Sequence, residues 1–226
     1  MGMKRVALVT GASRGLGTEV CRQLAAAGLA VWCTARDETD ARRVAERIGG
    51  DARAARLDVT DAARVAALAG RVERLDVLVN NAAVDYDTDQ RALGADLARV
   101  RANLDTNLLG PWRVAQAFAP LLRASGHGRL VNVSSGAGSI TEMTSSGAPA
   151  YSLSKLALNG LTRMLAAELR ADHVLVNAVC PGWTATDMGG GGRPLADGAR
   201  SIVWACLLGD DGPTGGFFRD GRRLDW

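Results

Sequence analysis

Two residues that could carry out acid–base chemistry, Tyr151 and Lys155, stand four positions apart in a segment with a helical pattern. On a helix, residues i and i+4 share one face, with Cβ atoms roughly 5–6 Å apart. An ammonium at that distance favours the phenolate, so it should lower the pKa of the tyrosine from its reference value of about 10. Such a phenol can donate a proton to a carbonyl oxygen, or accept one from an alcohol, nearer neutral pH. The spacing alone also fits an ordinary surface pair on a helix, so the rest of the chain must decide between the two interpretations.

A glycine-rich loop near the amino end supplies that context. Thr10–Gly17 follows the apolar run Val6–Val9 and precedes a helical pattern, with its glycines spaced G-x-x-x-G-x-G. Gly11 allows a tight turn between strand and helix, and Gly15 and Gly17 let a pyrophosphate approach the backbone at a helix N-terminus. An ordinary glycine-rich turn is the alternative, but the position between the first strand and the first helix favours a nucleotide site. In this order along the chain, the loop and the Tyr–Lys pair predict an oxidoreductase.

Two arginines are placed for an additional phosphate. Arg14 lies inside the glycine loop, and Arg36 ends the second strand, where a dinucleotide-binding fold places the adenosine ribose. A guanidinium there can bind a 2′-phosphate through two hydrogen bonds, whereas an acid there would accept from a 2′-hydroxyl. Asp37 stands next to Arg36, but we interpret it as the N-cap of the following helix. The sequence therefore predicts NADPH rather than NADH as the cofactor.

The composition excludes several other classes of protein. The chain has 226 residues, of which 47% are hydrophobic, enough for one large core and few for two domains. Its net charge of +3 arises from dispersed basic residues, which argues against a nucleic-acid partner. The cysteines form no C-x-x-C pair and the histidines, at positions 127 and 173, lie far apart, so no metal site is predicted. Without a signal-peptide core or an apolar run near the roughly 18 residues of a membrane span, we expect a cytoplasmic protein.

Short apolar runs alternate with helical patterns along the chain. The predicted strands are Lys4–Thr10, Ala30–Ala35, Ala52–Leu57, Leu75–Asn80, Gly128–Ser134, Val174–Val179 and Gly215–Arg219. The predicted helices are Gly15–Ala27, Asp37–Ile48, Asp61–Val72 opened by Thr60, Asp96–Ser125 interrupted near Gly110-Pro111, Ala150–Ala171 and Leu195–Leu208. Strands that are apolar throughout, each followed by a helix, indicate a parallel sheet covered on both faces. We therefore predict one doubly wound, Rossmann-type α/β domain over residues 1–226, with ligands at the carboxyl ends of the strands.

These features resemble the short-chain dehydrogenase/reductase family over nearly the whole chain. Thr10–Gly17 resembles its cofactor loop, and Asn80–Ala83 resembles its N-N-A-G segment with Ala83 in place of the glycine. The other family-like segments are Asp58 within Leu57–Val59, Asn107 within Asp105–Leu108, Val131–Ser135 and Pro181–Thr184. The segments Gly182-Trp183, Thr186–Met188 and Gly212–Asp220 are similar to the carbonyl-reductase-like branch, whose members typically use NADPH.

The resemblance implies a role for each site residue. Tyr151 would be the proton donor and acceptor, with its pKa lowered by Lys155, which would also bind the nicotinamide ribose. Ser135, preferred over Ser134, would stabilise the substrate oxygen, and Asn107 would order a water that links Lys155 to solvent. The residues implied in cofactor binding are Gly11, Ser13, Arg14, Gly15, Leu16, Gly17, Arg36, Asp58, Asn80, Tyr151, Lys155, Pro181, Gly182 and Thr184.

The resulting hypothesis is NADPH-dependent reduction of a ketone or aldehyde to an alcohol. An alcohol dehydrogenase acting in the oxidative direction is one alternative, and a non-catalytic regulator that senses NADP(H) is another, which the presence of both Tyr151 and Lys155 disfavours. We expect a small-molecule partner, and a homodimer or homotetramer formed through the long helices before Ser125 and after Ala150, as is common in the family.

Three loops should border the substrate, at about residues 83–95, 136–149 and 182–195. Their expected pocket walls are Val84–Asp87, Ala137–Met143 and Trp183–Met188. Met143, Trp183 and Met188 would provide an apolar substrate face, although each could equally be ordinary packing. The interval between Ser135 and Tyr151 is longer than the family's commonest spacing, with the extra length expected in Thr141–Pro149. Gly189–Gly192 fits either a lid hinge or a plain surface loop.

Overall fold

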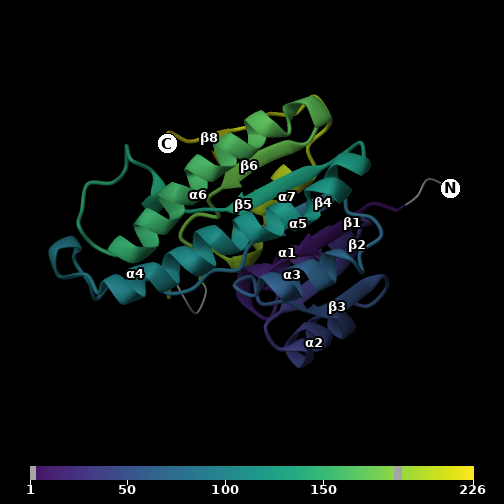
Figure 1. Cartoon of the computed structure of the whole chain (residues 1–226), viewed down its shortest axis with the longest axis horizontal. Coiled ribbons are helices and arrows are strands. Elements are labelled where there is room, and N and C mark those ends of the chain that lie inside the picture. The colour runs from purple at the N-terminus through teal and green to yellow at the C-terminus, as the bar shows by residue number, and fades with distance from the viewer. Residues whose placement is uncertain (1–3, 186–189) are drawn as a thin grey trace.

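The computed structural model describes residues 4–185 and 190–226, and these form an α/β fold around a single sheet. The strands are β1 Val6–Val9, β2 Ala30–Ala35, β3 Ala52–Arg56, β4 Val77–Asn80, β5 Arg129–Val133, β6 Leu175–Val179, β7 Phe217–Arg219 and β8 Arg222–Arg223. Their order is β3-β2-β1-β4-β5-β6-β7-β8, parallel except for β8 (Figure 1). The order reverses between β1 and β4, and the carboxyl ends of strands at such a point are where open α/β sheets bind ligands.

Helices cover both faces of the sheet (Figure 1). They are α1 Gly15–Ala26, α2 Glu38–Ile48, α3 Ala62–Ala69, α4 Leu97–Leu104, α5 Gly110–Ala124, α6 Pro149–Glu168 and α7 Leu195–Cys206. Short helical turns occur at Ala92–Gly94, Asp105–Leu109, Gly136–Gly138 and Arg170–Asp172.

Two hydrophobic cores result from the alternation of side chains along the strands. Leu8 and Leu78 point into a core with α3, α5 and α6, whereas Val9 and Val79 point into a core with α1, α2 and α7. All of these strand residues are fully buried. The predicted doubly wound sheet is therefore confirmed, and both faces of its central strands are covered.

The structure differs from the predicted elements at three places. The N-cap of α3 is Asp61, whose side chain accepts from Arg64 N, rather than Thr60, and the helix ends at Ala69 rather than Val72. The interruption that we predict near Gly110-Pro111 in the helix 96–125 lies a few residues earlier, where a π-helical turn, Asp105–Leu109, separates α4 from α5. A further strand, β8, pairs with β7 through a tight turn in which Asp220 and Gly221 both have positive φ, the conformation that the Asp-Gly dipeptide favours.

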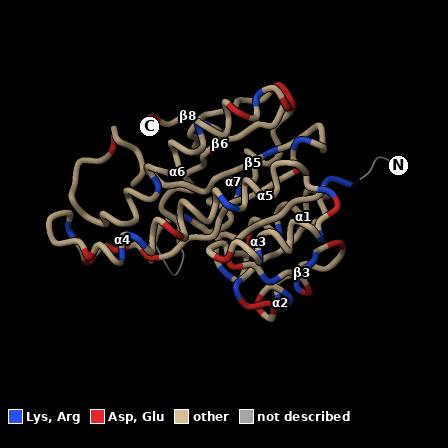
Figure 2. Tube along the Cα trace, viewed as in Figure 1, with Lys and Arg blue, Asp and Glu red and all other residues tan. Residues whose placement is uncertain are grey.

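The surface charge agrees with the prediction from composition. Lys and Arg are interspersed with Asp and Glu over the visible trace (Figure 2). Across residues 4–185 and 190–226, no helix is long and apolar enough to cross a membrane.

Candidate active site

A cleft of about 1080 Å³ opens at the carboxyl ends of the parallel strands. It runs from the glycine loop after β1 to the end of β7, so segments from both ends of the chain contribute to it. Of the predicted site residues, it is lined by Gly11, Ser13, Arg14, Gly15, Leu16, Gly17, Arg36, Asp58, Ser135, Tyr151, Lys155, Pro181, Gly182 and Thr184. Asn80 and Asn107 do not line it.

The glycine loop is a tightly packed cradle, in which side chains on two of the glycines would clash with the surrounding backbone. Gly11 has φ +65°, and a Cβ on it would lie 2.8 Å from Cα of Ala82. A Cβ on Gly17 would lie 2.3 Å from the carbonyl oxygen of Gly11. Helix α1 begins at Gly15, so its unpaired amides are presented at the cleft. This combination of bare backbone and a helix N-terminus fits a pyrophosphate.

The adenosine end of the cleft carries Arg36 and Asp58. The Asp37 side chain accepts from Thr39 N at 2.8 Å, which confirms its interpretation as the N-cap of α2. Asp58 accepts from the amide and the hydroxyl of Thr60, at 3.0 and 2.7 Å. Partial burial raises the pKa of Asp58, but these bonds and the nearby Arg36 outweigh burial and leave the pKa below its usual value. The donor set fits a nucleotide with an additional phosphate, with Arg36 exposed beside an ionised carboxylate.

Asn80 lies beneath the cleft rather than in it. Its side chain is buried and its Nδ2 donates to Asn132 Oδ1 at 2.9 Å, which ties β4 to β5. The neighbouring Asn81, which the sequence analysis did not single out, lines the cleft and donates through Nδ2 to the carbonyls of Thr10 and Gly11. The second residue of the N-N pair thus holds the glycine loop in place.

Tyr151 and Lys155 lie side by side on α6, with the Lys155 Nζ 5.5 Å from the centroid of the tyrosine ring. The ammonium is buried and donates to the carbonyl of Val133 at 2.9 Å. Burial lowers the pKa of Lys155 to about 8. Burial also raises the pKa of Tyr151 to about 12, against the opposing effect of a hydrogen bond with Ser135.

The predicted lowering of the Tyr151 pKa by Lys155 is therefore wrong for this structure. Desolvation of the phenol dominates, and the ammonium is directed at a backbone carbonyl beside the ring rather than acting on the hydroxyl.

The two adjacent serines have different surroundings. Ser134 is buried and donates to Asn159 Oδ1 at 2.7 Å, so its hydroxyl is engaged in the interior. Ser135 caps a short helical turn, accepts from Ala137 N at 3.2 Å and interacts with the Tyr151 hydroxyl. This geometry favours Ser135 over Ser134 as the serine that could meet a substrate oxygen.

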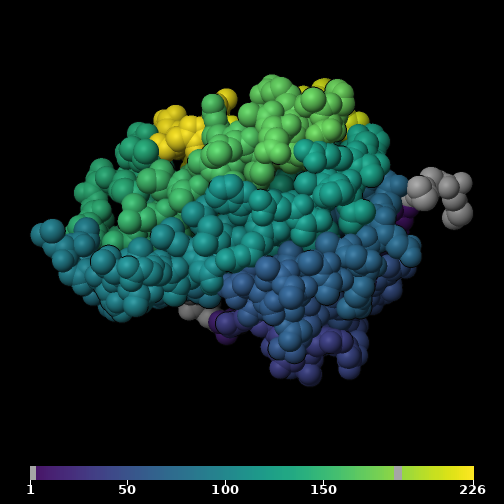
Figure 3. Space-filling view, viewed as in Figure 1, coloured from purple at the N-terminus to yellow at the C-terminus, as the bar shows by residue number. Residues whose placement is uncertain are grey.

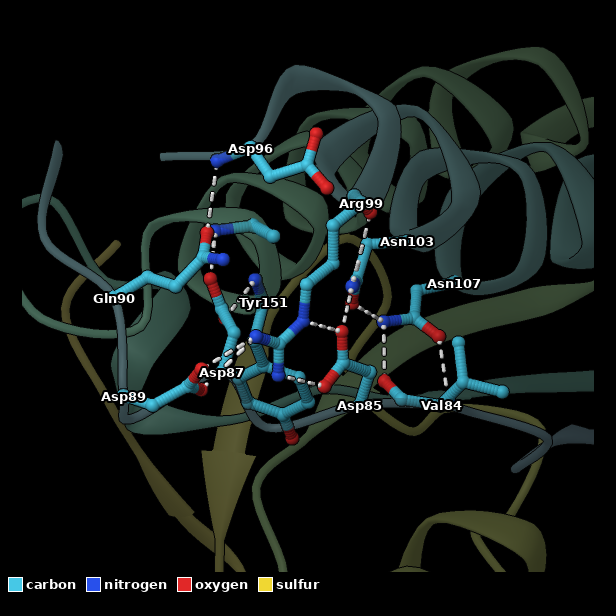
Figure 4. Close-up of polar contacts among 11 residues, drawn as sticks. Val84, Asp85, Asp87, Asp89, Gln90, Asp96, Arg99, Asn103, Asn107 and Tyr151 are labelled. Carbon is cyan, nitrogen blue, oxygen red and sulfur yellow. Dashed lines mark hydrogen bonds and ion pairs between the residues drawn. The ribbon is translucent and has the colours of Figure 1, made fainter. Parts of the chain in front are cut away.

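Asn107 is fully buried in the π-helical turn between α4 and α5. Its Oδ1 accepts from Val84 N at 2.9 Å (Figure 4), and its Nδ2 donates to Ser154 Oγ at 3.1 Å. Ser154 in turn donates to the Tyr151 carbonyl at 2.7 Å. These contacts connect the loop after β4 to the backbone of Tyr151, and no direct Asn107–Lys155 hydrogen bond accompanies them.

Asp87, predicted only as part of a pocket wall, has a role in capping a helix that the sequence did not reveal. Its carboxylate is fully buried and accepts from Ala150 N and Tyr151 N, at 2.9 and 3.0 Å (Figure 4). The residue before α6, Ala148, has no side chain that could cap the helix, so a carboxylate from a distant loop does so. The absence of a capping residue before Pro149 was the available signal, but it does not say which distant residue replaces it.

An ion-pair network holds the same loop on α4. Arg99 donates to Asp85 through two bonds of 2.6 Å and to Asp89 at 2.8 Å (Figure 4). These bonds keep the Arg99 guanidinium charged, because its carboxylate partners raise its pKa. Asn103 adds a bond to Asp85. The network fixes the segment that carries Asp87.

The expected substrate loops lie around the mouth of the cleft. Val84, Ala137 and Trp183 line it, and Trp183 is 72% exposed. Met143 lines a smaller adjoining pocket of about 180 Å³. Parts of the predicted pocket wall and of the predicted hinge lie outside the described residues, namely Thr186–Met188 and Gly189.

The described ends of the 182–195 loop are held together. Thr184 and Arg193 form an isolated parallel bridge, in which Arg193 N donates to the Trp183 carbonyl at 2.8 Å. The Arg193 guanidinium donates to both carboxylate oxygens of Asp220, at 2.8 Å each. A hinge at Gly189–Gly192 stays a prediction, with a plain surface loop as its alternative.

Comparison with known proteins places this arrangement in a family. The family model for short chain dehydrogenases matches residues 5–194. The chain is 40% identical to short-chain reductase protein NovJ of Streptomyces niveus, covering 83% of this chain and 72% of that protein. It is 32% identical to carbonyl reductase 1 of Sus scrofa, whose name specifies NADPH, covering 98% and 94%. The NADPH-bound carbonyl reductase structure from chicken fatty liver superimposes with a TM-score of 0.88, at 27% identity and 100% coverage of both chains.

The fold and the cleft thus define a nicotinamide-dependent class of oxidoreductase. The chain belongs to the short-chain dehydrogenase/reductase family, and its relatives include carbonyl reductases, as the motifs predicted.

Proposed function

We propose that this protein reduces a ketone or aldehyde to an alcohol with NADPH. The observation that carries the proposal is the position of Tyr151, whose hydroxyl interacts with Ser135 in the same cleft as the glycine cradle. Two cleft arginines, Arg14 and Arg36, support NADPH over NADH. The NADPH named or bound in the similar carbonyl reductases is consistent with this choice.

The mechanism follows from the chemistry of these side chains. A bound nicotinamide supplies the hydride. Ser135 donates a hydrogen bond to the carbonyl oxygen and stabilises the negative charge that develops there. Tyr151 gives its proton to that oxygen, and because its pKa is about 12 before ligands bind, it is fully protonated and ready to act as an acid at neutral pH. Lys155, whose pKa is about 8 and whose ammonium lies beside the Tyr151 ring, would hold the cofactor ribose.

Replacing Tyr151 by Phe tests the proposal, because it keeps the ring and removes only the hydroxyl. General acid catalysis contributes roughly 10²–10⁴-fold, so turnover should fall by at least that amount. NADPH affinity, measured by fluorescence titration, should change little. A panel of ketones and aldehydes, followed by NADPH absorbance, provides the rates.

The matched control is Tyr86→Phe, because Tyr86 packs edge-on against Tyr151, with ring centroids 5.0 Å apart, and also lines the cleft. Its effect should be far smaller. A Tyr151→Phe enzyme within a few-fold of the normal rate would show that the proton comes from elsewhere.

The same assay separates the alternatives. An enzyme that acts in the oxidative direction would convert alcohols with NADP⁺ faster than it reduces the matching carbonyls at neutral pH. A non-catalytic NADP(H) sensor would bind NADPH and turn over neither set.

A further inference from the structure

Arg219, at the carboxyl end of β7, is a charged residue of the cleft that the proposed mechanism does not use. The register of the sheet places it beside Cys180, because Val179 pairs with Phe218 and Cys180 N donates to the Phe218 carbonyl. A Cβ on Gly136 would lie 3.1 Å from Nη2 of Arg219. The guanidinium therefore lies next to the residue that follows Ser135, at the substrate end of the cleft.

The hydrogen-bonding capacity of this guanidinium is largely unused. Among the described residues, its enclosed Nε finds no acceptor, and the acceptor of Nη2 is the sulfur of Cys180 at 3.2 Å. A thiol sulfur is a weak acceptor. Among residues 4–185 and 190–226, no carboxylate forms an ion pair with Arg219, whereas Arg193 and Arg99 each have one or more. A part-buried guanidinium whose donors lack strong acceptors is stabilised strongly by an anionic ligand.

One acidic side chain already approaches the same position. Glu142, in the exposed loop after β5, also lines the cleft, and its Oε2 would lie 2.7 Å from a Cβ on Gly136. It interacts with Arg219 through space without forming an ion pair. A carboxylate is thus attracted to this corner of the cleft and would compete with any anion that binds there.

We propose that Arg219 forms a subsite for a carboxylate on the substrate, so that the preferred substrates are keto acids or aldehyde acids. This inference rests on the proposed reductase function and specifies its substrate class. Arg219 binds the carboxylate while Ser135 and Tyr151 meet the carbonyl oxygen, which orients the carbonyl between two fixed points.

Matched substrates test the subsite directly. Keto acids with one, two or three carbons between the ketone carbonyl and the carboxylate are each compared with the methyl ester of the same acid. The quantity compared is kcat/KM with NADPH. The unmutated enzyme should prefer the acid. In Arg219→Met the acid-to-ester ratio should fall about ten- to hundredfold, the effect of losing a charge-assisted hydrogen bond.

Three further variants sharpen the result. Arg219→Lys keeps the charge without the paired donors and should give an intermediate ratio. Glu142→Gln removes the competing carboxylate and should raise the ratio, mainly through KM. Arg222→Met removes an equal charge from β8, outside the cleft, and should leave the ratio unchanged.

The outcomes separate this proposal from the one on which it rests. Esters reduced with an unchanged acid-to-ester ratio in Arg219→Met would overturn the subsite and leave the reductase intact. If neither acids nor esters are reduced but other ketones or aldehydes of the panel are, the subsite proposal is overturned and the reductase stands. If nothing in the panel is reduced, the reductase proposal fails. The subsite is then judged by thermal shift with the same keto acids and their amides: stabilisation by acids alone that Arg219→Met abolishes supports it, and equal shifts in both proteins overturn it.

Discussion

At the scale of single residues, Lys155 lies in the candidate active site, and burying its charge there lowers the stability of the folded protein. It is 2% exposed, and burial lowers its pKa from 10.5 to about 8. Below pH 8 the ammonium is charged in both the folded and the unfolded chain, so the folded state bears the full cost of burying the charge. Between pH 8 and about 10.5 the unfolded chain keeps a proton that the folded chain has lost, so this residue makes stability rise with pH over that window.

Lys155→Met should therefore stabilise the cofactor-free protein while it abolishes activity and weakens NADPH binding. The gain should be on the order of 3 kcal/mol below pH 8, since each pKa unit corresponds to about 1.4 kcal/mol, and it should shrink toward pH 10. Urea denaturation of both proteins from pH 7 to 10 measures it. The difference between the proteins is the quantity to follow, because the buried Cys206, whose pKa is raised to about 12, opposes Lys155 above pH 9 in both.

The chain offers a matched control in Lys4, its other lysine, which is exposed and pairs with Asp51. Lys4→Met should change stability little at any of these pH values. A Lys155→Met protein that is less stable than the original at pH 7 would show that the buried ammonium is well compensated.

Cofactor choice is also decided by single residues. Arg36→Asp places a carboxylate where a 2′-phosphate is expected, so the preference for NADPH should narrow or reverse. The loss of a charge-assisted bond corresponds to about ten- to hundredfold in NADPH affinity. Michaelis constants for NADPH and NADH give the result. Arg42→Asp, an equal charge change on the exposed surface of α2, is the control. Equal constants for the two cofactors in the unmutated enzyme would contradict the prediction.

At the scale of elements, helix α6 depends on a loop that lies far from it in sequence. Asp87 accepts from the first amides of α6, where a negative charge also complements the helix dipole. Asp87→Ala would leave two buried amides without a partner and should lower stability by about 2–4 kcal/mol. It should lower turnover as well, because Tyr151 lies in that first turn. Asp87→Asn should have a smaller effect, since its amide oxygen can still accept one bond.

Asp89→Ala is the matched control for the cap. Asp89 lies two residues away, is 67% exposed and bonds only to Arg99, so its loss should change stability by less than about 1 kcal/mol. Equal urea midpoints for Asp87→Ala and Asp89→Ala would rule out the cap as a significant contribution.

The same elements show what a sequence can predict. Strands β1 to β7 and the long helices follow from local patterns, because apolar runs, glycine stops and N-caps such as Asp37 act within a few residues. The glycine loop and Tyr151 with Lys155 are also local in spacing. Asp87 and Arg219 are not, because their roles arise from contacts with α6 and Cys180 that only the folded chain creates. Strand β8 is intermediate, since its Asp220-Gly221 turn is a recognisable local signal.

At the scale of the whole molecule, the described parts of the chain contain no group of three or more His, Cys, Asp or Glu that could hold a metal ion. Reduction should therefore survive exhaustive treatment with EDTA. The same treated samples should be sized by light scattering, so that an effect on assembly is separated from one on catalysis. Activity that disappears with EDTA and returns with zinc or magnesium would contradict the prediction.

The layer formed by α5 and α6 carries exposed apolar side chains. Both helices pack on the same core, yet their outer sides carry the exposed apolar residues Trp112, Leu153 and Met164 (Figure 3 shows this side of the molecule). Contiguous exposed apolar patches mark interaction sites, and our hypothesis is that these three side chains form one. We predict a homo-oligomer formed through this layer, with a mass at least twice the 23.6 kDa of the chain in size-exclusion chromatography with light scattering.

The double variant Trp112→Glu, Met164→Glu should be monomeric, because a charge at each position would be buried without a partner. Leu207→Glu, at an exposed position after α7 in the opposite layer, should retain the assembly. A mass of one chain at all concentrations, or a double variant that keeps the larger mass, would show that the apolar face has another role.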